Sequence, residues 1–302
     1  MLRKYFGLLR AAVTEFIADD ALSHGAAIAY YTVTSMAPVL LIVVAIAGFV
    51  FGTEAAQGAI VEQLSGLMGS QSAQVLQSIV QSAGNRGSGK MATIIGVATL
   101  LITASGVFGE MQSSLNVIWK TEPKEGTVSR LVRARLLSLG LVATLGFLLL
   151  VSLVISTALN AAGTWFNGVV PGFHMILQVV NFLVSLLTVA VLFGAVYKIL
   201  PDKRLTWGDV AVGAFSTAIL FTFGKSLISL YIGSSTIATS YGAAGALIVI
   251  LIWVYYSAQI FLLGAEFTKV YSNSRNSRPA EREADDSHPE IARLKKDLRT
   301  RV

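Results

Sequence analysis

Long apolar blocks that recur along the chain constrain its fold more than any other feature. Each block is long enough, at 1.5 Å of rise per residue, for a helix to cross the roughly 30 Å hydrocarbon core of a bilayer. Only 13% of the 302 residues are charged, against about 25% in soluble domains, and no alternating pattern favours a lipid-facing barrel. The sequence therefore predicts an all-α polytopic membrane protein with six transmembrane helices, at residues 30–51, 91–119, 136–159, 175–197, 208–232 and 243–267.

The positions of Lys and Arg predict the orientation of these helices, because cytoplasmic loops of membrane proteins are enriched in both residues. Most of the 23 Lys and Arg lie in the N-terminal segment, in the loops after the second and fourth spans, and in the C-terminal tail. Only Arg86 and Lys90 lie in the long loop after the first span. Both termini are therefore expected in the cytoplasm, and topology rather than nucleic acid binding accounts for the net charge of +6.

Three regions flank or interrupt the membrane domain, which we place at residues 29–271. Residues 1–28 contain an amphipathic helix, which either lies on the inner leaflet or packs against the cytoplasmic face of the bundle. The outer loop at 53–90 has apolar residues at helical spacing between glycine-rich stretches, so we expect short outer-face helices that act as a cap or a lid. The tail at 272–302 is charged and poor in aromatic residues, which is typical of a mostly disordered segment.

Lys225 is the most informative single residue, because an ammonium within a membrane span is costly and is usually turned toward protein, water or the interface. It shares one helical face with Ala214, Ala218, Thr222 and Ser229, and this small, polar face is expected to point into the bundle. One interpretation is that Lys225, Thr222 and Ser229 bind an anion or lipid headgroup. The other is that Lys225 extends its side chain to the outer interface.

A second set of polar residues lies at the inner ends of the spans. Glu110, Gln112 and Asn116 form a candidate polar network within span two, and Glu110 is expected to meet an Arg or Lys at the cytoplasmic rim. Glu266 lies close to Lys269 at the inner end of span six and is expected to cap that end.

The sequence offers little for an enzyme to use. It has no cysteine and three histidines, and it lacks a phosphate-binding loop, GxSxG and HExxH. Asp19, Asp20 and His24 could bind a metal or relay protons, but capping and turn roles are favoured at this spacing. We therefore expect no enzyme activity, no metal and no cofactor.

Several segments resemble the YihY/virulence factor BrkB family. The resemblance covers nearly the whole membrane region, apart from the 53–90 loop and the residues after Tyr271. It implies a bacterial inner-membrane protein with six helices and both ends in the cytoplasm. The family was once labelled ribonuclease BN, but this sequence has no set of groups for phosphodiester cleavage. The resemblance is carried by AAIAYYTVTSMAPVLLIV, LNVIWK, YKILPDKRLTWGDVAVGA and SYGAAGALIVILIWVYYSAQIFLLGAEFTKVY.

Two functional hypotheses follow. Members of the family are associated with envelope integrity and resistance to host defences, and some with movement of envelope lipids, so the resemblance implies transport or transfer of lipids or lipid-linked anions. The basic inner loops would attract anionic headgroups. The alternative is a non-transporting scaffold that binds envelope proteins through the 53–90 loop and the tail. The expected partners are membrane lipids and other envelope proteins, not nucleic acid, and the sequence does not predict an oligomeric state.

Overall fold

The computed structural model describes residues 2–52, 70–84, 106–121, 151, 173–203, 205–234 and 237–287, together with 54, 57–58, 61–62 and 65. Within these residues all regular structure is helical, which confirms an all-α protein. A short helix over residues 106–118 accompanies the six labelled ones. The labelled helices are α1 (Leu2–Ala18), α2 (Ala21–Phe51), α4 (Ser70–Gly84), α7 (Phe173–Ile199), α8 (Trp207–Ser234) and α9 (Ile237–Ser287).

Three of the described helices are long and apolar enough to cross a membrane. They are Met175–Ile199, Trp207–Ile232 and Ala244–Arg275, and they correspond to the last three predicted spans. The span predicted at 30–51 lies within α2. The span predicted at 136–159, apart from Val151, and the first part of the one at 91–119 lie outside the described residues. The count of six spans therefore stays a prediction.

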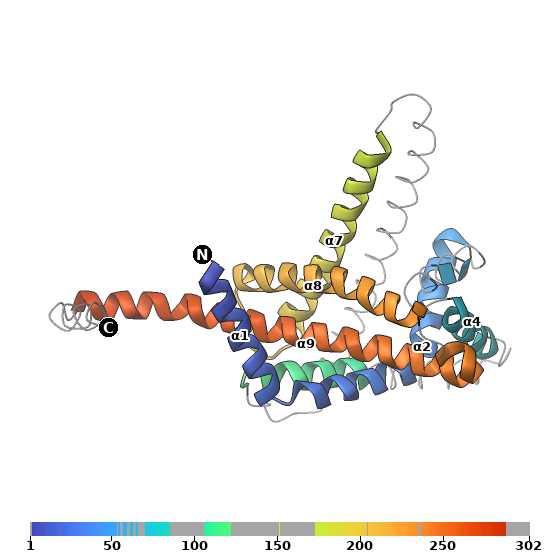
Figure 1. Cartoon of the computed structure of the whole chain (residues 1–302), viewed down its shortest axis with the longest axis horizontal. Helices are drawn as coiled ribbons and strands as arrows, with labels where there is room; N and C mark the ends of the chain where they lie inside the picture. Colours follow the sequence, from blue (N-terminus) through green and yellow to red (C-terminus); the bar gives the residue numbers. More distant parts are fainter. Residues whose placement is uncertain are drawn as a thin grey trace.

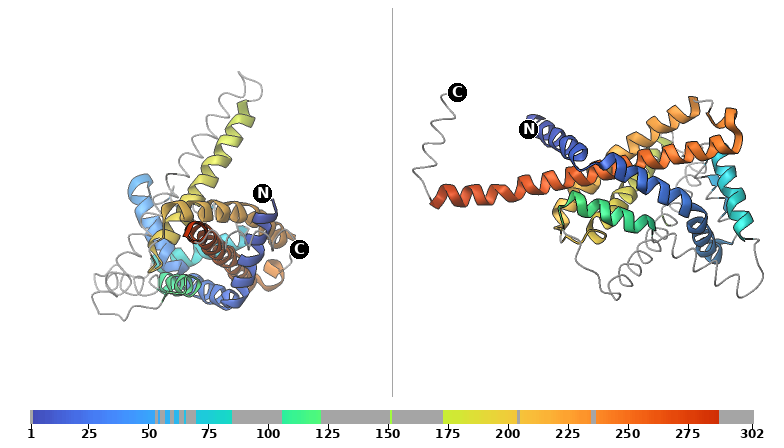
Figure 2. Two further views of the ribbon diagram at one scale, coloured as in Figure 1. Left: turned by 90° about the vertical axis from the view of Figure 1, so that its left-hand side faces the viewer. Right: turned by 90° about the horizontal axis from the view of Figure 1, so that it is seen from below.

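The helix α9 organises the rest of the bundle. It contacts α1, α2, α4 and α8, and in Figure 1 it runs the length of the molecule, with α8 on one side and α2 on the other. The helix α7 packs on α8 and then leaves it at a steep angle (Figure 1). The helix α4 contacts α2 and α9 at the end of the bundle far from the two chain termini (Figure 2). The buried Leu76 of α4 joins Ala29 of α2 and Val249 of α9 in one hydrophobic cluster at this contact.

The helix α1 crosses the other end of the bundle and packs on α9 (Figures 1 and 2). Leu8 and Ala12 are buried, whereas Phe6 and Ile17 are 71% and 68% exposed. At 100° per residue, Leu8 and Ala12 fall on one side of the helix, and Phe6 and Ile17 fall on nearly the opposite side. One apolar strip is therefore covered by protein, and a second is left uncovered by the described residues.

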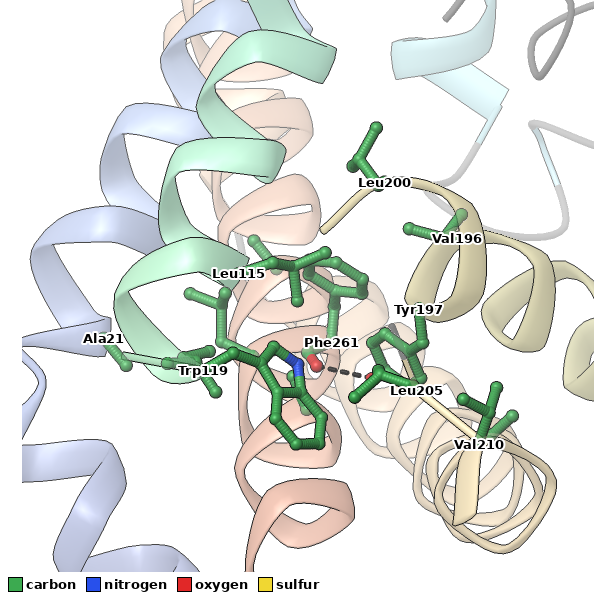
Figure 3. Close-up of a cluster of buried hydrophobic side chains, with 14 of the residues drawn as sticks. Ala21, Leu115, Trp119, Val196, Tyr197, Leu200, Leu205, Val210 and Phe261 are labelled. Carbon is green, nitrogen blue, oxygen red and sulfur yellow. Dashed lines mark hydrogen bonds between the residues drawn. The ribbon is translucent and has the colours of Figure 1, made fainter. Parts of the chain in front are cut away.

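The main hydrophobic core joins α7, α8 and α9 to the helix 106–118 (Figure 3). Tyr197 lies at its centre, fully buried, and its hydroxyl donates a 2.6 Å hydrogen bond to the backbone oxygen of Phe261. The Tyr197 hydroxyl also lies 3.2 Å from Thr217 Oγ1. These bonds satisfy a polar group that would otherwise be costly to bury among apolar side chains.

Close approach of α8 and α9 depends on glycines that alternate with threonines. A Cβ on Gly213 would lie 2.7 Å from Cβ of Thr268, and one on Gly264 would lie 2.8 Å from Cβ of Thr217. Gly213 and Thr217 are four residues apart on α8, as are Gly264 and Thr268 on α9, so the two helices are antiparallel in this region. Each threonine hydroxyl is satisfied within its own helix, by the oxygens of Gly213 and Gly264.

Candidate functional site

Lys225 lies on the inward side of α8 and is half-buried. Ala218, two turns before it, and Ile228, one turn after it, are both buried. Its ammonium makes no hydrogen bond or ion pair with the residues that the structure describes. The Thr222 hydroxyl donates to the backbone oxygen of Ala218 at 2.7 Å, so that proton is used within the helix.

The predicted small, polar face of α8 differs in burial along its length. Ala214 and Ala218 are buried as expected, but Thr222, Lys225 and Ser229 are only half-buried. The predicted anion-binding residues therefore share a side of α8, at a depth between the core and the surface.

Within the described part of the chain, Glu110, Gln112 and Asn116 are not hydrogen-bonded to one another, and two of them contact other helices or loops. Glu110 and Gln112 are two residues apart and point in different directions, and Asn116 pairs with a residue outside its helix. Glu110 Oε1 lies 3.5 Å from Nδ1 of His24, in place of the expected Arg or Lys. Asn116 makes two hydrogen bonds to Asp202, from its Nδ2 to a carboxylate oxygen and from the Asp202 backbone N–H to its Oδ1. Gln112 is half-buried and forms neither contact.

A partly buried set of charges that the sequence did not predict lies where α1, α9 and the end of the helix 106–118 meet. We call Glu15, Asp19, Lys120, Glu266 and Lys269 the ionic cluster. The Lys269 ammonium donates to three carboxylates, at 2.8 Å to Glu15, 3.1 Å to Asp19 and 3.2 Å to Glu266. Lys120 donates to the other oxygen of Asp19. Five charged groups from distant parts of the chain are thus joined at one end of the bundle.

The backbone around the ionic cluster is unusual. Asp20 and Lys120 are the described non-glycine residues with positive φ, at 51° and 50°. Lys120 ends its helix in a Schellman motif, with backbone bonds from Thr121 to Asn116 and from Lys120 to Val117. A non-glycine residue in this region costs energy and persists only where its surroundings require it. Here the turn places the Lys120 ammonium on Asp19.

Hydrogen bonding determines the protonation state of Asp19. Burial by itself would raise the pKa of this carboxyl, but the hydrogen bonds from Lys120 and Lys269 outweigh burial and lower the pKa below its usual value. Asp19 is therefore an anion at neutral pH. Its carboxylate pairs with Lys120 and Lys269 and does not cap α2, the role that the sequence favours. Its neighbour Asp20 does form the expected turn, since its carboxylate accepts a 3.0 Å hydrogen bond from Ser23.

Carboxylate oxygens of Glu15, Asp19 and Glu266 lie within 4.8 Å of one another, a spacing that suits a metal ion. The Lys269 ammonium already donates its three hydrogens to the same three groups. The cluster thus carries its own cation, and a metal would have to displace it.

A second polar contact ties the beginning of α8 to α9. Thr206 caps the N-terminus of α8: the Asp209 N–H donates to Thr206 Oγ1, and the Thr206 hydroxyl donates to the Asp209 carboxylate. Ser272 and Arg275 of α9 donate to the same carboxylate at 3.0 and 3.2 Å. The buried Asp209 therefore stabilises the N-terminus of α8 and pairs with α9.

The loop between α7 and α8 lies at this same end. Lys203 lies 5.2 Å from the centre of the Trp119 ring, and Lys198 lies 5.3 Å from that of Trp207. The four segments that the sequence assigns to one side of the membrane therefore contact one another. Sequence patterns suggested local roles for Asp19, Glu266 and Lys269 and none for Glu15 or Lys120. One feature of the sequence could have indicated the ionic cluster: several helices carry charged residues at the same predicted distance from the membrane, with no partner nearby in the sequence.

Comparisons with known proteins identify the chain. The model of the virulence factor BrkB family matches residues 12–289. A membrane protein YihY of Escherichia fergusonii is 31% identical over 220 residues, which cover 71% of this chain and 70% of that protein. A membrane protein of a Psychrobacter strain is 27% identical over 278 residues, which cover 87% of this chain and 48% of that relative. No solved structure matches the chain. Since the family model matches nearly all of its length, this chain belongs to the virulence factor BrkB family of membrane proteins.

Proposed function

We propose that this protein transports or transfers lipids or lipid-linked anions in the bacterial inner membrane, as a six-span protein with both termini in the cytoplasm. The observation that carries the proposal is Lys225, an ammonium on the inward side of an apolar helix, without a counter-ion among the described residues. The relatives of this chain are named as membrane proteins, which supports a location in a membrane. Their names state no activity, so the transport role is inferred from Lys225.

The energetics favour a binding role for Lys225. A lysine at the centre of a membrane helix costs about 3 kcal/mol even when its chain can bend toward the interface. A side chain with that cost is retained where a bound anion compensates for it. A lipid phosphate is such an anion, and charge-assisted hydrogen bonds to phosphate are stronger than those between neutral groups.

A reconstituted assay tests the proposal. Full-length protein in vesicles of phosphatidylethanolamine and phosphatidylglycerol, with a trace of fluorescent phosphatidylglycerol, reports lipid movement between leaflets through a membrane-impermeant quencher. We expect Lys225→Met to reduce the rate at least tenfold and Lys225→Arg to retain most of it, because the arginine keeps the charge. Lys203→Met is the matched control, since it removes a lysine from an exposed loop. An unchanged rate in Lys225→Met contradicts the proposal.

A packed interior supports the alternative of a non-transporting scaffold. Near the ionic cluster, the space between α7, α8 and α9 is filled by side chains such as Tyr197 and Phe261, whose rings stack at 5.3 Å. A scaffold requires such rigidity and no path for substrate. In that case wild-type vesicles show no lipid movement above empty vesicles, and deletion of residues 276–302 abolishes the cellular function while Lys225→Met does not.

A further inference from the structure

We propose that the ionic cluster is a proton-binding site, in which one oxygen of Glu266 takes up a single exchangeable proton from the water at that end of the bundle. This inference does not depend on lipid transport, because it concerns a different part of the molecule from Lys225.

The first observation is an unsatisfied oxygen. The Glu266 side chain is 0% exposed, and its Oε2 accepts a 3.2 Å hydrogen bond from Lys269. Its Oε1 is buried and has no hydrogen-bond partner among the described residues. A buried carboxylate oxygen without a donor is unfavourable, whereas a protonated one becomes a donor itself.

The second observation is the balance of charge. Fully ionised, the cluster holds three carboxylates, of Glu15, Asp19 and Glu266, against the two ammonium groups of Lys120 and Lys269. One negative charge remains. Transfer of a proton from hydronium to Glu266 gives a neutral carboxylic acid and water, and leaves two carboxylates for two ammonium groups. The carboxylates of Glu15 and Asp19, each with an oxygen within 4.8 Å of one of Glu266, are the acceptors nearest to the new O–H among those of the cluster.

The other charged groups of the packed helices do not supply the missing positive charge. Asp209 of α8 pairs with Arg275 of α9. Glu110 on the helix 106–118 lies against His24 of α2. Neither pair includes Glu266, so among the residues that the structure describes the charges next to it are those of Glu15, Asp19, Lys120 and Lys269.

The geometry favours a proton over a metal ion. The Lys269 ammonium already donates to all three carboxylates. A metal ion would have to displace this ammonium, whereas a proton adds to Oε1 without moving it.

Exposure falls stepwise from water to Glu266. The Glu15 side chain is 42% exposed, that of Asp19 is 4% exposed and that of Glu266 is 0% exposed. All three are joined through the Lys269 ammonium. A proton that arrives at Glu15 is therefore one hydrogen-bonded group away from the buried acid.

Infrared difference spectroscopy tests the proposal. The full chain in lipid nanodiscs is compared at neutral and mildly acidic pH, and a buried carboxylic acid is detected by its C=O stretch. We expect such a band in the wild type and its loss in Glu266→Gln, which keeps the shape of the side chain. Glu110→Gln is the matched control and should keep the band.

A second measurement needs no substitution. Labelling glutamate with carbon-13 should shift the band of the wild-type chain, whereas labelling aspartate should not. The proposal is overturned if the band is absent from the wild type or responds only to labelled aspartate. It is also overturned if magnesium, calcium or sodium ions at constant pH produce the same spectral change, since that result identifies a metal site.

Discussion

Asp19 illustrates how a single residue can be misjudged from its sequence neighbours. Together with Asp20 and His24 it precedes the first predicted span, where the sequence favours capping and turn roles. In the structure Asp20 forms the turn, while Asp19 is buried and accepts hydrogen bonds from lysines 101 and 250 residues away. Adjacent residues of the same type thus have different roles, because only one of them faces α9.

The lowered pKa of Asp19 predicts how stability depends on pH. Since the folded pKa lies below the unfolded value of 3.8, the ionised carboxylate stabilises the fold above that pH, and the contribution is lost as the pH falls through the folded pKa. Asp19→Asn should lower the free energy of unfolding at neutral pH by about 2 kcal/mol, because a neutral amide replaces the carboxylate that accepts charge-assisted hydrogen bonds from Lys120 and Lys269.

Thermal unfolding in detergent across an acidic pH series measures this effect. We expect the wild-type midpoint to fall with pH below about 4 and the Asp19→Asn midpoint to fall less. Asp20→Asn is the control, because Asn tolerates the positive φ of this turn. If the unfolding midpoint falls with pH equally steeply in Asp19→Asn and in the wild type, Asp19 is not the titrating group.

At the scale of helices, the sequence predicted the last three spans well and the packing between them only in part. The apolar blocks located α7, α8 and α9 because a bilayer requires long, continuous apolar segments. The small residues Ala214 and Ala218 were correctly placed on the inward face. The contact of Gly213 with Thr268 was not predicted, since it depends on the register between α8 and α9, which no local pattern specifies.

Adding one methyl group at this contact should separate the two helices. In Gly213→Ala the new Cβ would lie 2.7 Å from the Cβ of Thr268, a β-branched residue that cannot move away without its backbone. We expect a loss of about 1–3 kcal/mol in the free energy of unfolding. Gly109→Ala is the control, because a Cβ there meets nothing within 4 Å. Denaturant titration of both variants, followed by tryptophan fluorescence, should show a lower midpoint for Gly213→Ala alone.

At the scale of the whole molecule, charge pattern and three-dimensional contacts agree. The N-terminal segment, the end of the helix 106–118, the loop after α7 and the last part of α9 were grouped by their Lys and Arg residues, and the structure brings them together. The ionic cluster itself could not be predicted, since its residues come from three regions and three of them have plausible local roles. The positive-inside rule identifies charged residues that lie on the same side of the membrane. Which of these residues pair with one another depends on how the helices pack, which the sequence does not specify.

Labelling of single cysteines tests the orientation, and the absence of native cysteine makes the experiment simple. Gln74 of α4 and Thr14 of α1 are both exposed, and the two helices lie toward opposite ends of the bundle (Figure 2). A membrane-impermeant maleimide should label Gln74→Cys in intact spheroplasts and should label Thr14→Cys only after the membrane is permeabilised. The reverse pattern would invert the proposed topology.

The length of α9 has a mechanical consequence. A continuous helix of 51 residues is about 75 Å long, more than twice the roughly 30 Å thickness of the hydrocarbon core. The helix α9 contacts α4 near one end and α1 nearer the other end. With the proposed orientation, α9 would link its C-terminal part on the cytoplasmic side directly to α4 on the other side of the membrane.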